Sequence, residues 1–103
     1  STHEISTDEI DLLLALFEHH VEQYPDDKKG YDGLRLLIEN DISKSAEMLA
    51  KLLTSIPPDS IPPAVGVDLL ILIKVKPNLE DIFKSPLDYL RTTKSMIAAA
   101  LLN

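Results

Sequence analysis

The chain contains no cysteine among its 103 residues, and it has only three glycines. The absence of cysteine excludes disulfides, thiolate zinc sites, iron–sulfur clusters and cysteine nucleophiles. So few glycines do not make a phosphate-binding loop, and the Gly-x-Ser-x-Gly motif of serine hydrolases is missing. The carboxylates fall on the predicted solvent faces of helices, which does not favour acid–base catalysis. We therefore predict that the protein is not an enzyme and uses no cofactor.

Long hydrophobic runs are also missing. The longest apolar stretches fall far short of the roughly 20 residues that a membrane-spanning helix needs. The polar, acidic N-terminal residues lack the pattern of a secretory signal, so a cytoplasmic location is expected. A content of 45% hydrophobic and 26% charged residues is typical of one globular domain. We predict a single domain over residues 1–103, either complete or a fragment of a larger protein.

The charge is distributed unevenly along the chain. Residues 1–50 carry twelve acidic and four basic side chains, a net charge of −8, whereas residues 51–103 carry five acidic and six basic side chains, a net charge of +1. The acidic half repels phosphate backbones, which argues against nucleic-acid binding. It favours an encounter with a basic protein surface, although an acidic surface that only keeps the domain in solution is the alternative.

The first predicted helix begins after Ser6 and ends before Pro25. Ser6 and Glu9 have the spacing of a capping box, and Pro25 restricts the residue before it to non-helical conformations. Apolar residues recur at helical spacing, and Leu12 and Leu16 widen the apolar arc beyond half of the helix. This pattern predicts that the helix packs against two neighbours.

Further helices follow, and together they predict an all-α bundle of five to six helices. After a polar turn at 26–30, the apolar periodicity and the capping residues indicate helices over 32–40, 43–55, 78–84 and 85–102. The start at 85 depends on a serine cap followed by Pro86 at the first helical position. Four prolines within 57–63 predict a rigid corner at 56–63, with Ile56 and Ile61 in the core.

Residues 64–76 are ambiguous between helix and strand. Val and Ile alternate with other residues here, which is typical of a strand. No second strand is evident to pair with it, so we favour a helix that is buried at the centre of the bundle. A strand paired across a homodimer is the alternative. Asp68, within this apolar segment, is expected to form an ion pair with one of four bases: Lys74, Lys76, Arg91 or Lys94.

The function that the charge asymmetry favours is a non-catalytic protein-interaction or regulatory module, in the manner of an immunity or adaptor protein. An acidic N-terminal helical surface would meet a basic partner. The candidate partner-binding residues are Asp8, Asp11, Glu18, Glu22, Asp26 and Asp27. The neighbouring His19 and His20 point about 100° apart around a helix, so we predict no metal site there.

Three alternatives stay open. The apolar excess of several helices would also suit a bundle that encloses an apolar small ligand. Residues 36–53 resemble the first part of a helix-turn-helix, with a tight turn at 40–42, and this resemblance implies a DNA-associated regulator. The paired short helices and the apolar C-terminal end would also suit a fragment of an α-solenoid.

Overall fold

The computed structural model describes residues 6–91, and this part of the chain is all-α, as predicted. Its order is α1 (Thr7–Gln23), α2 (Lys28–Glu39), α3 (Ser43–Ser55), the short 3₁₀ helix η1 (Pro58–Ser60), α4 (Pro63–Val75), a second 3₁₀ helix η2 (Pro77–Leu79) and α5 (Glu80–Leu90). No strand occurs within residues 6–91, so the ambiguous segment 64–76 is a helix.

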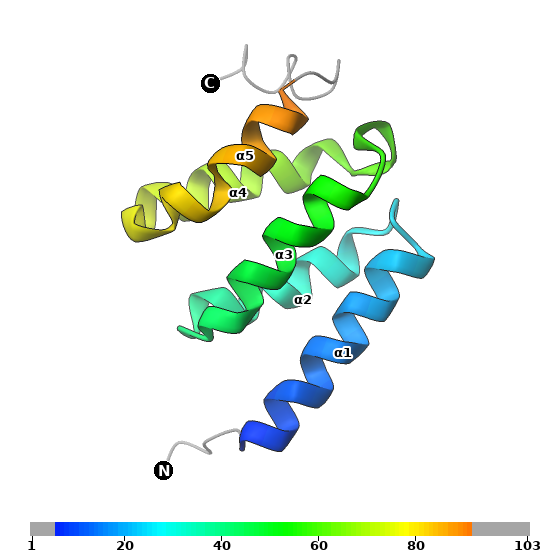
Figure 1. Cartoon of the computed structure of the whole chain (residues 1–103), viewed down its shortest axis with the longest axis vertical. Helices are drawn as coiled ribbons and strands as arrows, with labels where there is room; N and C mark the ends of the chain where they lie inside the picture. The colour runs from blue at the N-terminus through cyan, green and yellow to red at the C-terminus, as the bar shows by residue number, and fades with distance from the viewer. Residues whose placement is uncertain (1–5, 92–103) are drawn as a thin grey trace.

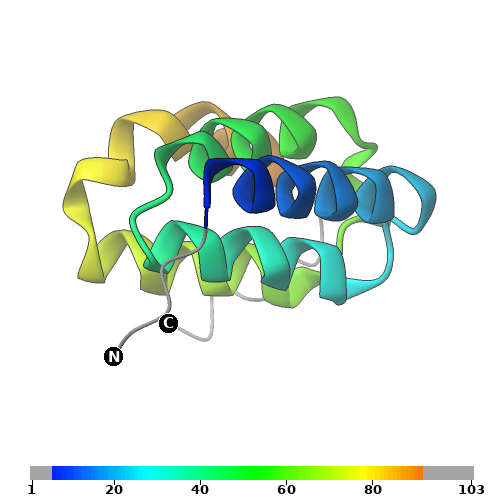
Figure 2. The same ribbon diagram turned by 90° about the horizontal axis from the view of Figure 1, so that it is seen from below.

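The helices form two layers, with α1, α3 and α5 in one and α2 and α4 in the other (Figures 1 and 2). Successive α-helices alternate between the layers and run in opposite directions. α1 packs on α2 and α3, α2 packs on α3 and α4, and α5 packs on α3 and α4. Each helix therefore contacts helices one or two places away in the chain, as in a stack of helical repeats.

The core lies between the two layers. Its largest fully buried side chains are Tyr31, Phe83, Leu34, Leu49, Leu53, Leu69, Leu90 and Val21. The prolines at 57–63 carry the chain from α3 to α4 with Ile56 and Ile61 buried, as predicted for this corner. Residues 58–60 form the η1 turn, while Pro57 and Pro62 are extended.

α1 begins and ends where the sequence predicts. The Ser6 side chain accepts a hydrogen bond from the Glu9 backbone N–H, and the helix ends at Gln23, two residues before Pro25. α1 packs against two neighbours, α2 and α3, as predicted. Its wide apolar arc is nevertheless not buried throughout, because Leu12 is 63% exposed and Leu16 is 55% exposed. α1 lies at the edge of its layer, so α2 and α3 cover only its inner side.

α2 begins at Lys28, four residues earlier than predicted, and the predicted polar turn at 26–30 is correspondingly shorter. Asp27 caps the helix by accepting a hydrogen bond from the Lys29 backbone N–H. Gly30 and Gly33 face α1 at close range. A Cβ atom at Gly33 would lie 2.4 Å from the Phe17 ring, and one at Gly30 would lie 2.6 Å from Val21 Cγ2. The glycines therefore allow α1 and α2 to approach closely.

α4 is a helix, but the prediction that it is buried on all sides at the centre of a bundle is wrong. Its buried side chains are on one side, whereas Ile71 is 57% exposed and Val75 is 73% exposed. The cause is the two-layer arrangement. Within its layer α4 has only α2 as a neighbour in the described part of the chain.

The predicted break between two helices at Ser85 and Pro86 is wrong. The helix runs continuously through Pro86 from Glu80 to Leu90, and η2 replaces the predicted start at residue 78. Pro86 has no N–H to donate to the preceding turn, which disfavours a helix interior. Pro86 is buried together with Phe83 and Leu87, and packing against α3 offsets that loss. The predicted continuation over 92–102 lies outside the described residues.

Candidate protein-interaction surface

The outward side of α1 combines acidic and apolar side chains. At about 100° per residue, Asp11, Glu18 and Glu22 fall within roughly 40° of one another around the helix. The exposed Leu12 and Leu16 lie one helical turn apart, on average about 120° around the helix from these carboxylates. We call this surface the α1 outer face; it comprises Asp8, Asp11, Leu12, Leu16, Glu18 and Glu22.

The structure does not bring the six predicted acidic residues into one cluster. Asp8 lies in the first turn of α1 and Glu22 in its last turn, about 20 Å further along the helix. Asp26 and Asp27 lie beyond the helix, in the turn that leads into α2. Four of the six therefore belong to the α1 outer face, and the other two belong to the α1–α2 turn.

Two of these carboxylates already have partners within the domain. Asp11 Oδ1 lies 3.4 Å from Lys44 Nζ at the start of α3. Asp27 accepts the capping hydrogen bond from the Lys29 N–H and lies 2.9 Å from His20 Nε2. The capping bond and, after it, the His20 contact lower the pKa of the Asp27 carboxyl. Asp27 thus has a structural role that the sequence analysis missed.

Glu18 and Glu22 form no ion pair within residues 6–91; Glu22 is exposed and Glu18 is half-buried. His20, beside them in sequence, instead joins the end of α1 to the start of α2 through Asp27 and packs against Tyr24, with the ring centroids 5.1 Å apart. No three His, Asp or Glu side chains in the described part of the chain are grouped so that they could hold a metal ion.

Asp68 forms an ion pair, as predicted, but with a different partner. Its Oδ2 lies 2.8 Å from Lys28 Nζ at the start of α2. The predicted partners on α4 and α5 are wrong because Asp68 faces α2, and Lys76 pairs instead with Asp41. Lys94 lies outside the described residues. The bond to Asp68 is the main cause that raises the pKa of Lys28.

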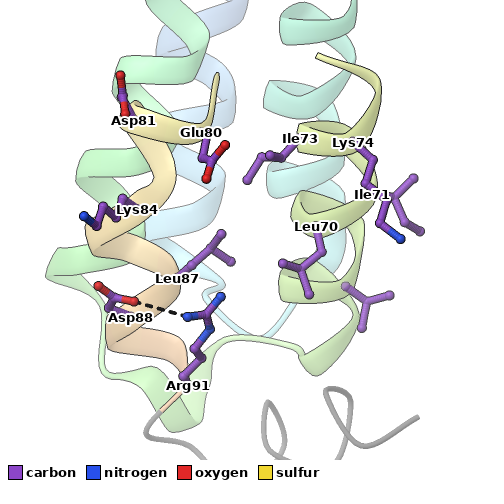
Figure 3. Close-up of a pocket in the computed structure, with 11 residues that line it drawn as sticks. Leu70, Ile71, Ile73, Lys74, Glu80, Asp81, Lys84, Leu87, Asp88 and Arg91 are labelled. Carbon is purple, nitrogen blue, oxygen red and sulfur yellow. Dashed lines mark hydrogen bonds and ion pairs between the residues drawn. The ribbon is translucent and has the colours of Figure 1, made fainter. Parts of the chain in front are cut away.

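A groove of about 540 Å³ lies between α4 and α5, which the sequence analysis did not predict. Figure 3 shows Leu70 and Ile73 of α4 and Leu87 of α5 pointing into it. Charged side chains also line the groove: Lys74, Glu80, Asp81, Lys84, Asp88 and Arg91. We call this feature the α4–α5 groove.

Comparison with known proteins places the chain in no family: no family model matches its sequence, and no curated protein or solved structure matches it significantly.

Across residues 6–91, none of the helices combines the length and the apolar character that crossing a bilayer requires.

Proposed function

We propose that the protein is a non-catalytic protein-interaction module that binds a basic partner through the α1 outer face. The observation that supports this proposal is the pair of exposed leucines, Leu12 and Leu16, on the same helix as the half-buried Glu18 and the exposed Glu22. The sequence pattern predicts an acidic surface; the structure adds an apolar strip to it.

The two parts of the surface would contribute differently to binding. A single exposed leucine is ordinary, but two leucines one helical turn apart form a continuous apolar strip that a partner can cover. Burial of apolar surface is the dominant favourable term in most protein–protein associations. The carboxylates on the neighbouring flank of α1 would speed the encounter with a positively charged surface and fix its orientation.

The partner that this surface fits best is an amphipathic helix. Such a helix would lie along α1, with apolar side chains over Leu12 and Leu16 and with Lys or Arg on the side nearer Glu18 and Glu22. The length of α1, 17 residues or about 25 Å, offers enough surface for several turns of a partner helix.

The experiment is capture of partners from the host lysate by the immobilised chain, at low and at moderate salt, with three matched variants. Glu18→Lys/Glu22→Lys reverses the unpaired charges, and Leu12→Ser/Leu16→Ser removes the apolar strip. Glu80→Lys/Asp81→Lys makes the same change of charge on α5, at the other end of the stack. All six residues are exposed or half-buried, so the fold should be retained, and circular dichroism checks that it is.

We expect the first variant to lose the partner at low salt and to show little salt dependence, because the steering charges are gone. The second variant should lose the partner at both salt concentrations, since the apolar surface that the partner would bury is gone. The α5 variant should retain it. A partner that is captured equally by all four proteins would refute the proposal, and so would the absence of any stoichiometric partner.

A further inference from the structure

The α4–α5 groove lies at the opposite end of the stack from the α1 outer face, so it is not part of the proposed binding surface (Figure 1). Asp68 and Leu72 mark the side of α4 that faces α2. Leu70 and Ile73 project from the other side, where no described helix of the same layer covers them.

The order of the helices indicates what kind of element belongs in this groove. α2 follows α1 and lies in the second layer, and α4 follows α3 and lies in the second layer beside α2 (Figure 2). The position that continues this series after α5 lies under α5 and beside α4. That position is the α4–α5 groove, so the groove has the shape and place of a missing third helix of the second layer.

We propose that the segment 92–103 of this same chain occupies the α4–α5 groove as that third helix. The segment starts directly after Arg91, which itself lines the groove. Its apolar residues Ile97, Ala100 and Leu101 have the i, i+3, i+4 spacing of one helical face. This face would cover Leu70, Ile73 and Leu87.

The length of the segment agrees with this occupant. The lining of the groove on α4 extends from Val67 to Lys74, about 11 Å along the helix. Twelve residues reach about 18 Å as a helix, which leaves two to four residues for the turn after α5. A helix in this place runs antiparallel to α5 and parallel to α4, which brings Leu101 to the level of Ile71.

The absence of cysteine makes disulfide trapping a direct test. The test pair is Ile71→Cys/Leu101→Cys, with Ile71 on the groove. The control pair is Ile82→Cys/Leu101→Cys, because Ile82 is also an exposed isoleucine but does not line the groove. A flexible tail would reach both positions, since a short tether gives millimolar effective concentrations. Selective trapping therefore reports docking rather than proximity in sequence.

We expect an intramolecular disulfide in the test pair under mild oxidation at low protein concentration. In the control pair we expect a much lower disulfide yield. Adding Ile97→Asp to the test pair should reduce the yield to that of the control. Equal yields in the two pairs, or no effect of Ile97→Asp, would overturn the proposal. A disulfide between two chains would overturn it as well, because it would assign the groove to a second copy. None of these outcomes depends on the partner of the α1 outer face.

Discussion

The close contact between α1 and α2 depends on single residues. Gly33 lies in the interior of α2, where alanine would ordinarily be preferred by about 0.5–1 kcal/mol. Here the Phe17 ring occupies the space into which a Cβ atom would project. The backbone of α2 therefore serves as part of the packing surface, and the identity of residue 33 is set by its neighbour on another helix.

We expect Gly33→Ala to lower the free energy of unfolding by about 1–2 kcal/mol, because the cost of overpacking against Phe17 exceeds the gain in helix propensity. Urea denaturation measures the change. Phe17→Leu in the same background should recover part of the loss, since the smaller side chain leaves room for the new methyl group. A Gly33→Ala variant as stable as the parent would show that the helices separate at no cost.

At the scale of elements, the contact between α2 and α4 includes the ion pair of Lys28 and Asp68. The pKa of Lys28 is raised in the folded state. A raised lysine pKa means that the pair contributes its full stability below the lysine pKa of the unfolded chain. That contribution is lost as the pH rises through the higher pKa of the folded state.

Asp68→Asn should therefore reduce the stability at neutral pH and have little effect at strongly alkaline pH. We expect a loss of about 0.5–1 kcal/mol, at the level of surface pairs, because the Lys28 side chain is 37% exposed. Urea denaturation at both pH values measures it. Tyr31, whose buried ring raises its pKa to about 12, weakens both proteins alike at alkaline pH. Asp88→Asn, at an exposed pair with Arg91, is the matched control and should change little.

Local sequence signals predicted most of the helices, whereas the limits and orientation of the others depend on packing against neighbouring helices. Ser6, Glu9 and Pro25 act within one turn of α1, so its limits could be read from the sequence. Pro86 also disfavours a helix interior locally, but α5 continues through it because the helix packs against α3. The segment at 64–76 is apolar on every side, so periodicity could not say which side faces α2.

The candidate site divides in the same way. Composition alone predicted an acidic first helix; in the structure Glu22 is exposed and Glu18 is half-buried. Leu12 and Leu16 are exposed because α1 lies at the edge of its layer. The sequence around α1 contains no signal that predicts this edge position. The contact of Asp27 with His20 depends on the way the chain turns after Pro25.

At the scale of the whole molecule, stability should vary along the stack. α2 packs on α1, α3 and α4, and α3 packs on α1, α2 and α5. α1 and α5, by contrast, lie at the two ends of their layer. In such stacks local opening starts at the ends. We expect amide hydrogens of α2 and α3 to exchange most slowly and those of α1 to exchange first, as measured by native-state hydrogen exchange with mass spectrometry. Uniform protection of all helices would contradict this expectation.

The same nearest-neighbour packing has a consequence for the growing chain on the ribosome. Since α1, α2 and α3 pack on one another and are complete by Ser55, they can assemble before α4 has left the exit tunnel. Contacts between helices that are close in sequence require only short loops to be closed, which favours rapid folding. The rigid proline corner at 56–63 then separates an early-folding unit from the helices that are synthesised last.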